Sequence, residues 1–193
     1  MLGILGQKLG MTRLISAAGE VIPVTLVQTE QNAITRVKTT EKDGYNALVL
    51  GFKQFKHPSK VRKFRFVREF QVEKPEEFKD KPEIGIDAFA EGEIVSIQGI
   101  SKGKGFQGVV KRHKFKGGPA SHGSDHHREP GSMGTRKPRR VKAGKRMPGH
   151  MGSDQITLKH VQIVKIDAEK HIIAIKGPLP GSIQSLIRIT KVA

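Results

Sequence analysis

Residues 101–152 read SKGKGFQGVVKRHKFKGGPASHGSDHHREPGSMGTRKPRRVKAGKRMPGHMG and decide how the rest of the chain must be organised. This window of 52 residues holds 14 Lys and Arg against two acids, Asp125 and Glu129, so it carries +12 of the chain's net charge of +17. It also holds 11 of the 22 glycines and five of the eight histidines. A segment with so few apolar residues cannot bury enough surface to offset the entropy of its own ordering. We therefore expect a polyanion to order it, and nucleic acid is the obvious polyanion.

The remainder of the chain has the size and composition of a folded intracellular domain. Removing the window from 193 residues leaves about 140, enough for a sizeable core. The absence of cysteine excludes disulfides, iron–sulfur clusters and cysteine-based zinc sites, and is compatible with a reducing compartment. The sequence contains no run of 18 apolar residues, so we expect no transmembrane helix. The N-terminal residues do not resemble a secretory signal. We expect a cytoplasmic protein without a membrane partner.

The sequence on both sides of the window has the composition of β-strands. Short β-branched or aliphatic runs occur at Val21–Val27, Ala33–Val37, Ala47–Leu50, Val161–Ile166, Ile172–Ile175 and Leu186–Val192. Ala168–His171 is a plausible hairpin connection, and Gly177-Pro178-Leu179-Pro180-Gly181 predicts a loop before the last strand. Because helix patterns match poorly almost everywhere, the sequence predicts a mainly β fold, with its strands closed into an antiparallel barrel.

Residues 52–91 differ from the strands on either side. Phe64, Phe66, Phe70 and Val72 alternate along one predicted strand face. Pro75-Glu76-Glu77-Phe78-Lys79 has the proline and acids of a helical first turn. We interpret the segment as a small inserted α+β subdomain, and a long decorated connection is the alternative. The predicted division is a barrel of residues 1–51, 92–113 and 153–193, an insertion at 52–91 and an extension at 114–152.

The basic window begins with Ser101-Lys102-Gly103-Lys104-Gly105-Phe106-Gln107-Gly108-Val109-Val110-Lys111-Arg112. Alternating lysine and glycine lets the backbone approach phosphates while the ammonium groups neutralise them. The motif lacks the Gly-Lys-Ser/Thr ending of a Walker loop and the glycine spacing of a dinucleotide fingerprint. A generic solvated basic loop is the alternative interpretation of the same residues.

The clustered histidines, His122, His126 and His127, admit two interpretations. Zinc binding lacks a cysteine ligand and a His-Glu-x-x-His helix, so we favour histidines that stack on bases or donate to phosphates. Ser121-His122 and Ser124-Asp125-His126 contain the residue types of a catalytic triad. Adjacent residues of one extended loop rarely converge, however, and triads are assembled from distant positions. We expect no metal, no cofactor and no enzymatic activity.

Several motifs in this order resemble one known family. They are Gly6-Gln7-Lys8-Leu9-Gly10-Met11-Thr12, SKGKGFQGVVKR, His127-Arg128-Glu129-Pro130-Gly131-Ser132-Met133-Gly134, Gly149-His150-Met151-Gly152 and Lys176-Gly177-Pro178-Leu179-Pro180-Gly181. Together the motifs resemble the bacterial form of the large-subunit ribosomal protein L3 family. The resemblance covers essentially the whole chain and is weakest over residues 52–91.

This resemblance implies a six-stranded barrel of the translation-protein type on the outside of the large ribosomal subunit. A long basic, irregular extension would reach inward toward the peptidyl-transferase centre. The family binds large-subunit ribosomal RNA near its 3′ end, nucleates early assembly and contacts the neighbouring proteins L14 and L19. The implied protein is not a homo-oligomer, and its location is the cytoplasmic ribosome.

Charge and resemblance together select the predicted RNA contacts. The predicted rRNA-binding residues are Lys8, Lys102, Lys104, Lys111, Arg112, Lys114, Lys116, His122, His126, His127, Arg128, Arg136, Lys137, Arg139, Arg140, Lys142, Lys145 and Arg146. The predicted tip near the peptidyl-transferase centre comprises Arg128, Pro130, Gly131, Ser132, Met133, Gly134 and Thr135. Many bacterial members carry a methylatable glutamine where this chain has Thr135, so that modification is not expected here.

Three functions of different classes therefore stay open at the level of sequence. A structural ribosomal RNA-binding protein would bind RNA with strong salt dependence. A free-standing architectural protein would bind duplex DNA as tightly as ribosomal RNA. A metal-dependent hydrolase would need stoichiometric zinc at the histidine cluster. The family resemblance favours the first of these.

Overall fold

The computed structural model describes residues 2–60, 62–78, 81–137 and 139–192. The chain divides into two compact units. One comprises Met1–Ser101 together with Gln155–Ala193, and the other is Lys102–Asp154. We call them the globular unit and the basic segment.

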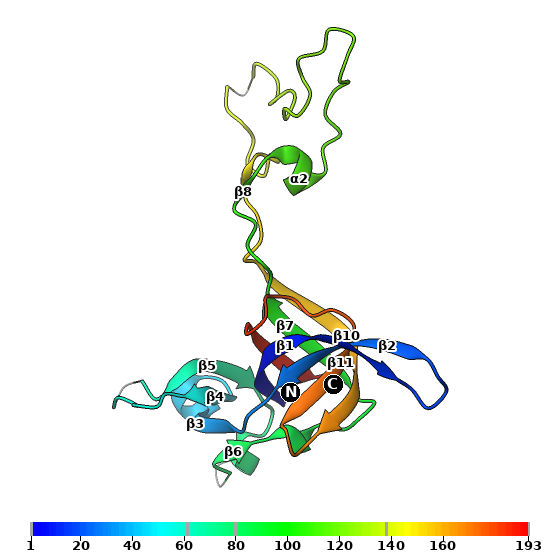
Figure 1. The fold of residues 1–193 in the computed structure, drawn as a ribbon. Helices are drawn as coiled ribbons and strands as arrows, with labels where there is room; N and C mark the ends of the chain where they lie inside the picture. The colour runs from blue at the N-terminus through cyan, green and yellow to red at the C-terminus, as the bar shows by residue number, and fades with distance from the viewer. Residues whose placement is uncertain (1, 61, 79–80, 138, 193) are drawn as a thin grey trace. The chain divides into compact units, whose positions relative to one another are not determined.

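Six antiparallel strands of the globular unit pair in a closed ring (Figure 1). In ring order they are β1 (Gly3–Ile15), β12 (Leu186–Lys191), β7 (Ile94–Ile100), β10 (Gln155–Asp167), β11 (Ile172–Lys176) and β2 (Val21–Gln28). β2 pairs back with β1, with Gln7 opposite Gln28 and Ile15 opposite Val21, so no strand of the ring has an unpaired long edge. A closed ring removes the exposed edges at which strands of different molecules could pair.

Alternation of side chains along the strands builds the core of the ring. In β7, Val95 and Ile97 are fully buried while Ile94 and Ile100 are exposed. In β12, Ile187 and Ile189 are fully buried and Arg188 between them lies on the opposite face. Burying each such aliphatic side chain is worth about 1.5–3 kcal/mol, so the ring is held by its β-branched interior.

A second sheet of four antiparallel strands packs against the ring within the globular unit. Its order is β5 (Phe64–Gln71), β4 (Ala47–Gln54), β3 (Asn32–Lys38) and β6 (Glu83–Ile84). Short helical turns accompany it: α1 (Thr40–Asp43), η1 (Pro75–Phe78) and η2 (Ile86–Ala88). The Asn32 side chain accepts a hydrogen bond from the Leu5 amide at 3.0 Å and donates one to the Leu5 carbonyl at 3.1 Å. A Cβ on Gly3 would lie 2.3 Å from the Phe70 ring, so glycine there lets the two sheets approach closely.

Most local predictions are confirmed, whereas the assignment of two strands is wrong. The mainly β character, the 168–171 turn, the 177–181 loop and the helical turn from Pro75 are present; Lys79, at the end of that predicted turn, lies outside the described residues. The runs at 33–37 and 47–50 were expected in the barrel, but they form β3 and β4 of the second sheet. Their places in the ring are taken by β1 and β7, in which glycines and polar residues interrupt the hydrophobic pattern. Residues 102–113, expected with the barrel, group with the basic segment.

Candidate nucleic-acid interface

The basic segment begins and ends with two paired arms. The Lys104 amide donates to the Met151 carbonyl at 2.9 Å, and the Met151 amide donates to the Gly105 carbonyl at 3.0 Å. Strands β8 (Phe106–Gln107) and β9 (Gly149–His150) continue the pairing. Gly152 has φ of +80°, and a Cβ there would lie 2.2 Å from the Lys102 carbonyl oxygen. Only glycine therefore permits this close approach of the arms.

A short helix, α2 (Val109–His113), follows the first arm. Val109 is its buried residue, at 1% exposure, and the helix ends at Lys114 in the left-handed conformation. The Arg112 guanidinium donates to the Met147 carbonyl at 2.7 Å, and His113 Nε2 lies 3.1 Å from the same oxygen. Arg112 thus fixes the helix to the returning chain and has fewer N–H groups left for a ligand than an exposed arginine has.

Two of the three clustered histidines make contacts inside their own loop. The Gly118 amide donates to the His127 carbonyl at 3.3 Å, which closes the loop, and His127 Nδ1 lies 2.9 Å from the Pro119 carbonyl. His126 Nδ1 lies 2.8 Å from a carboxylate oxygen of Glu129. His122 is exposed and has φ of +62°. Across residues 2–60, 62–78, 81–137 and 139–192, no three His, Cys, Asp or Glu side chains come close enough to hold a metal ion.

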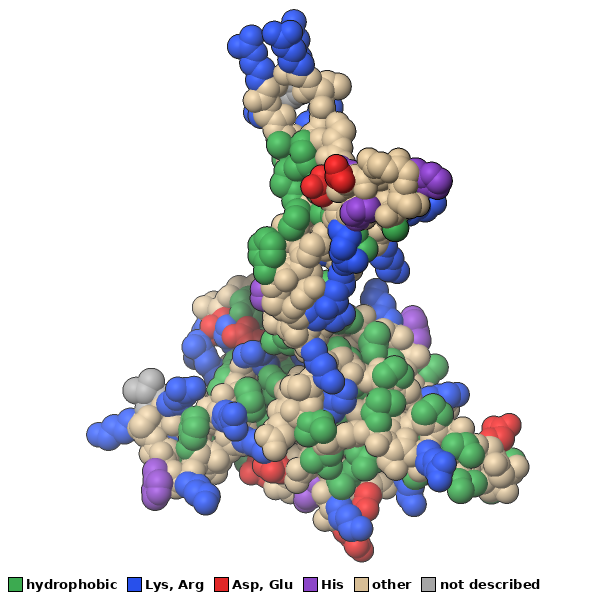
Figure 2. Space-filling model, turned by 45° about the horizontal axis from the view of Figure 1, so that its top comes forward, with side chains coloured by type: hydrophobic (Ala, Val, Ile, Leu, Met, Phe, Trp, Pro, Cys, Tyr) green, Lys and Arg blue, Asp and Glu red, His purple; other side chains and the backbone are tan. Residues whose placement is uncertain are grey.

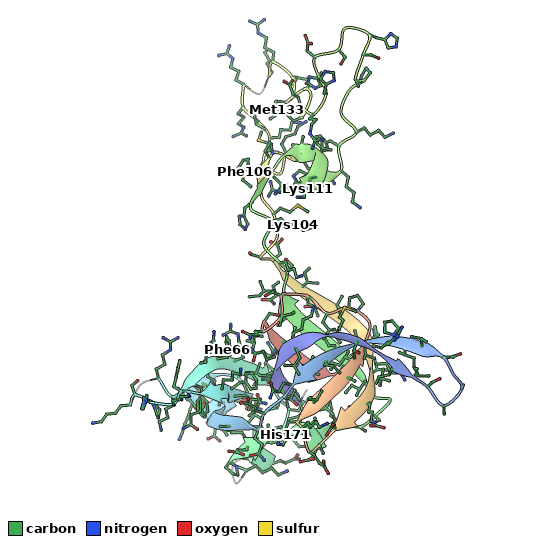
Figure 3. All side chains as sticks on the ribbon, in the orientation of Figure 1. Phe66, Lys104, Phe106, Lys111, Met133 and His171 are labelled. Atoms are coloured by element: carbon green, nitrogen blue, oxygen red, sulfur yellow. The ribbon has the colours of Figure 1, made fainter. Side chains whose placement is uncertain are left out.

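The predicted tip, residues 128–135, is an irregular turn held by its own polar groups. The Gly134 amide lies 3.3 Å from Ser132 Oγ, and Thr135 Oγ1 donates to the Lys137 carbonyl. Gly131 and Gly134 have φ of +75° and +139°, which favour glycine. Met133 is 38% exposed, so its side chain is available to a partner (Figure 3).

The Lys and Arg side chains described in the segment have no acidic partners. Within this segment the predicted contacts apart from Arg112 are exposed: Lys102, Lys104, Lys111, Lys114, Lys116, His122, His126, His127, Arg128, Arg136, Lys137, Arg139, Arg140, Lys142, Lys145 and Arg146. Within the described part of the chain, none of the 14 Lys and Arg of residues 102–152 forms an ion pair with Asp or Glu. Figure 2 shows blue Lys and Arg side chains projecting from the surface of this segment. Uncompensated charge held on a surface without a core is the electrostatic footprint of a nucleic-acid-binding protein.

Lys8, one of the predicted RNA contacts, is buried within the globular unit. It lies in β1 of the globular unit and is only 8% exposed. Its ammonium donates to the carbonyls of Leu179 at 2.8 Å and Gly181 at 3.2 Å. The side chain therefore fixes the 177–181 loop, and two of its ammonium N–H groups are engaged within the fold. Charge and the family motif suggested it as a contact, whereas in the structure its side chain is buried at the end of the buried half of β1.

Phe106 is an interface candidate that the predictions omitted. It is 77% exposed, stands opposite His150 in the β8–β9 pair, and follows Lys104 on the same arm (Figure 3). Aromatic rings exposed among cations are typical of surfaces on which unpaired bases stack. The sequence signal was present, because a phenylalanine in a segment without a core has no interior to occupy.

A mainly β globular unit joined to a cationic segment of irregular structure defines a structural nucleic-acid-binding protein. A family model of ribosomal protein L3 matches residues 59–177. The large ribosomal subunit protein uL3 of Oceanobacillus iheyensis is 46% identical over 200 residues, covering 97% of this chain and 96% of that protein. Proteins of the same name are 44% identical over 199 residues in Listeria monocytogenes (97% and 95% covered) and 45% over 197 in Bacillus thuringiensis (96% and 94%). The chain belongs to the ribosomal protein L3 family.

No helix in the described residues has the length and apolar character needed to cross a membrane.

Proposed function

We propose that the basic segment is the part of this chain that penetrates ribosomal RNA, while the globular unit anchors the protein on the large subunit. As a member of the L3 family, the chain is a structural constituent of the large ribosomal subunit in the cytoplasm, binds its ribosomal RNA and is not an enzyme. The observation that supports the division of labour is the set of 14 unpaired Lys and Arg on a segment with one buried hydrophobic side chain, Val109, in its described residues. Only a polyanion can compensate that much charge.

The finer placement follows the same proposal. The ring is a barrel of the translation-protein type and binds near the 3′ end of the large-subunit RNA, where the protein nucleates early assembly. The basic segment extends toward the peptidyl-transferase centre with residues 128–135 at its tip. The neighbouring proteins are L14 and L19. Small side chains and positive-φ glycines at the tip support this placement, because packed RNA leaves little room for side-chain bulk.

The division of labour is tested by the salt dependence of RNA binding. A triple variant, Lys102→Gln, Lys104→Gln and Lys111→Gln, removes three exposed charges without touching the structural Arg112. The slope of log K against log salt with large-subunit RNA should fall by up to about 0.7–0.9 for each phosphate that a lysine no longer neutralises. A matched triple variant of the globular unit, at the exposed Lys42, Lys159 and Lys165, should retain the slope. Equal slopes for all three proteins would refute the assignment, and equal binding to duplex DNA would favour the architectural alternative.

The placement of the tip is tested by photocrosslinking in assembled ribosomes. A crosslinking amino acid at Met133 should attach to RNA close to the peptidyl-transferase centre. The same amino acid at Ile183, exposed in the globular unit at 67%, is the control and should attach elsewhere. Crosslinks from position 133 confined to the subunit surface would refute the inward path.

A further inference from the structure

Two arginines converge on a small hollow that is lined entirely by residues of the globular unit. Its volume is about 80 Å³, a space large enough for one phosphate group. It is lined by Arg68, Gln98, Gly99, Ile100, Gln155, Leu186 and Arg188. These residues come from β5 of the second sheet and from β7, β10 and β12 of the ring, so folding alone brings them together.

Arg188 is held in place by its surroundings. It lies on the outer face of β12, opposite Gln98 of β7, and is half-buried. Its guanidinium lies over the Phe70 ring, 4.2 Å from the centroid, and that ring is itself fully buried. A planar cation stacked on a fixed ring presents its N–H edge in a defined direction, which suits bidentate recognition of an anion.

Among the described residues, no carboxylate forms an ion pair with the positive charge of Arg188. Burial, and next the nearby Arg68 cation, lower the pKa of Arg188 from its ordinary value, yet an arginine stays protonated in proteins. Within the described part of the chain neither arginine forms an ion pair. Arg188 also borders a neighbouring hollow with Glu69 and Glu73. The Glu69 carboxylate, however, is bound by the Lys38 ammonium at 2.7 Å and the Tyr45 hydroxyl at 2.8 Å.

We propose that Arg68 and Arg188 form a binding site for one backbone phosphate of RNA on the globular unit. The site rests on the proposed RNA-binding function and adds to it a contact outside the basic segment. The exposed amide of Gln155 can donate to the same phosphate, while the Gln98 amide already donates to Thr157 Oγ1 at 3.2 Å. Exposed Ile100, on the rim, offers apolar contact to the adjoining ribose. Phosphate rather than carboxylate is the ligand because two cations without an acid match the charge of a polynucleotide backbone.

The experiment uses the full chain and large-subunit RNA, with Arg68→Gln and Arg188→Gln as separate variants. Each should weaken binding about tenfold near 0.1 M salt and lower the salt slope by up to about 0.7–0.9, the value reached when the remaining arginine alone no longer neutralises the phosphate. The control is Arg13→Gln, which removes an exposed arginine from β1 of the same unit and should change neither value. Thermal unfolding of each variant separates loss of binding from loss of fold. If Arg188→Gln fails to fold, the exposed Arg68 decides the test.

The outcomes separate the site from the proposed function. If the wild-type chain does not bind the RNA, the proposed function fails whatever the arginines do. If the wild type binds and both arginine variants match Arg13→Gln, the phosphate site is refuted and the function stands. Poly-L-glutamate serves as a carboxylate probe in parallel. Variants that lose affinity for poly-L-glutamate and keep their affinity for RNA would also overturn the phosphate assignment.

Discussion

The globular unit and the basic segment differ in what holds each of them together. Of the 23 buried hydrophobic residues among the described positions, 22 belong to the globular unit and only Val109 belongs to the segment. The segment instead uses backbone pairing of its arms, carbonyl contacts from Arg112 and His113, and glycine turns. Hydrophobic burial thus stabilises the globular unit and contributes little to the basic segment, which carries the dense positive charge. The comparison teaches that the segment is shaped by local polar contacts, whereas a hydrophobic core holds the globular unit.

The largest effect on stability is expected when a buried residue of the globular unit, Ile97, is shortened, and the buried Val109 of the basic segment is the comparison. Ile97→Ala should lower the free energy of unfolding by about 2–5 kcal/mol, because it leaves a cavity in the ring. Val109→Ala should leave the main unfolding transition unchanged, because α2 has no further core around it. Denaturant unfolding followed by circular dichroism measures both. A comparable loss for the two variants would show that the segment folds cooperatively with the ring.

The second prediction concerns the paired arms of the segment. Gly152→Ala combines positive φ with a clash against the Lys102 carbonyl, and should open the pairing at a cost of roughly 2–3 kcal/mol. Amide exchange at Lys104 and Met151 should then accelerate, while the unfolding of the ring stays the same. The control is Gly144→Ala, with φ of +79° and open space around the new Cβ, which bears only the strain of about 1 kcal/mol. Unchanged exchange in Gly152→Ala would contradict the pairing of the arms.

Local sequence patterns predicted the elements of the globular unit better than their partners. The strands at 33–37 and 47–50 are short β-branched or aliphatic runs, and such runs do not specify which sheet a strand joins. What settles their place is tertiary: Asn32 binds the Leu5 backbone, and Gly3 makes room for Phe70. β1 escaped prediction because Gly3, Gly6 and Gly10 interrupt the β-branched texture that marks a strand.

In the candidate interface, too, some features could be predicted from the sequence and others depend on tertiary contacts. Exposure of most predicted cations follows from composition alone, because a segment without a core cannot bury them. The burial of Lys8 was not predicted, because its neighbours in the fold, the carbonyls of Leu179 and Gly181, lie far away in sequence. Arg68 and Arg188 escaped prediction for the same reason, since 120 positions separate them and only the packing of the two sheets brings them together. Whether the predicted cations contact RNA stays a prediction.

The third prediction tests a contact that does not depend on charge. Phe106→Ala should weaken RNA binding by about 1–3 kcal/mol, the value of one base stacked on an aromatic ring, and should leave the salt slope unchanged. Phe106→Tyr retains the ring and should bind as the wild type does. Affinity measurements at several salt concentrations give both quantities. If Phe106→Ala changes the slope and not the affinity extrapolated to high salt, the ring is not a stacking site.

The smallest expected effect concerns the Lys38–Glu69 ion pair of the globular unit. Among the described residues, the Lys and Arg of the basic segment form no such pairs. The hydrogen bond from Lys38 lowers the pKa of Glu69, and the same bond raises the pKa of Lys38. A lowered carboxyl pKa contributes stability above the unfolded value near 4.5, and this contribution is lost as the pH falls through the folded pKa. A raised lysine pKa contributes stability below 10.5, lost as the pH rises through the folded pKa. Both contributions are therefore present at neutral pH.

Because this pair lies at the surface and is screened by solvent and salt, Glu69→Gln should lower Tm only slightly at pH 7. The difference from the wild type should be smaller at pH 3 than at pH 7, because the carboxylate loses its charge as the pH falls through its lowered pKa. Glu20→Gln, at an exposed position whose side chain has no ion pair among the described residues, is the control and should leave Tm unchanged at both pH values. A Glu69→Gln difference as large at pH 3 as at pH 7 would mean that the side chain acts through packing. The contrast between the units would then rest on hydrophobic burial alone, without a contribution from paired charge.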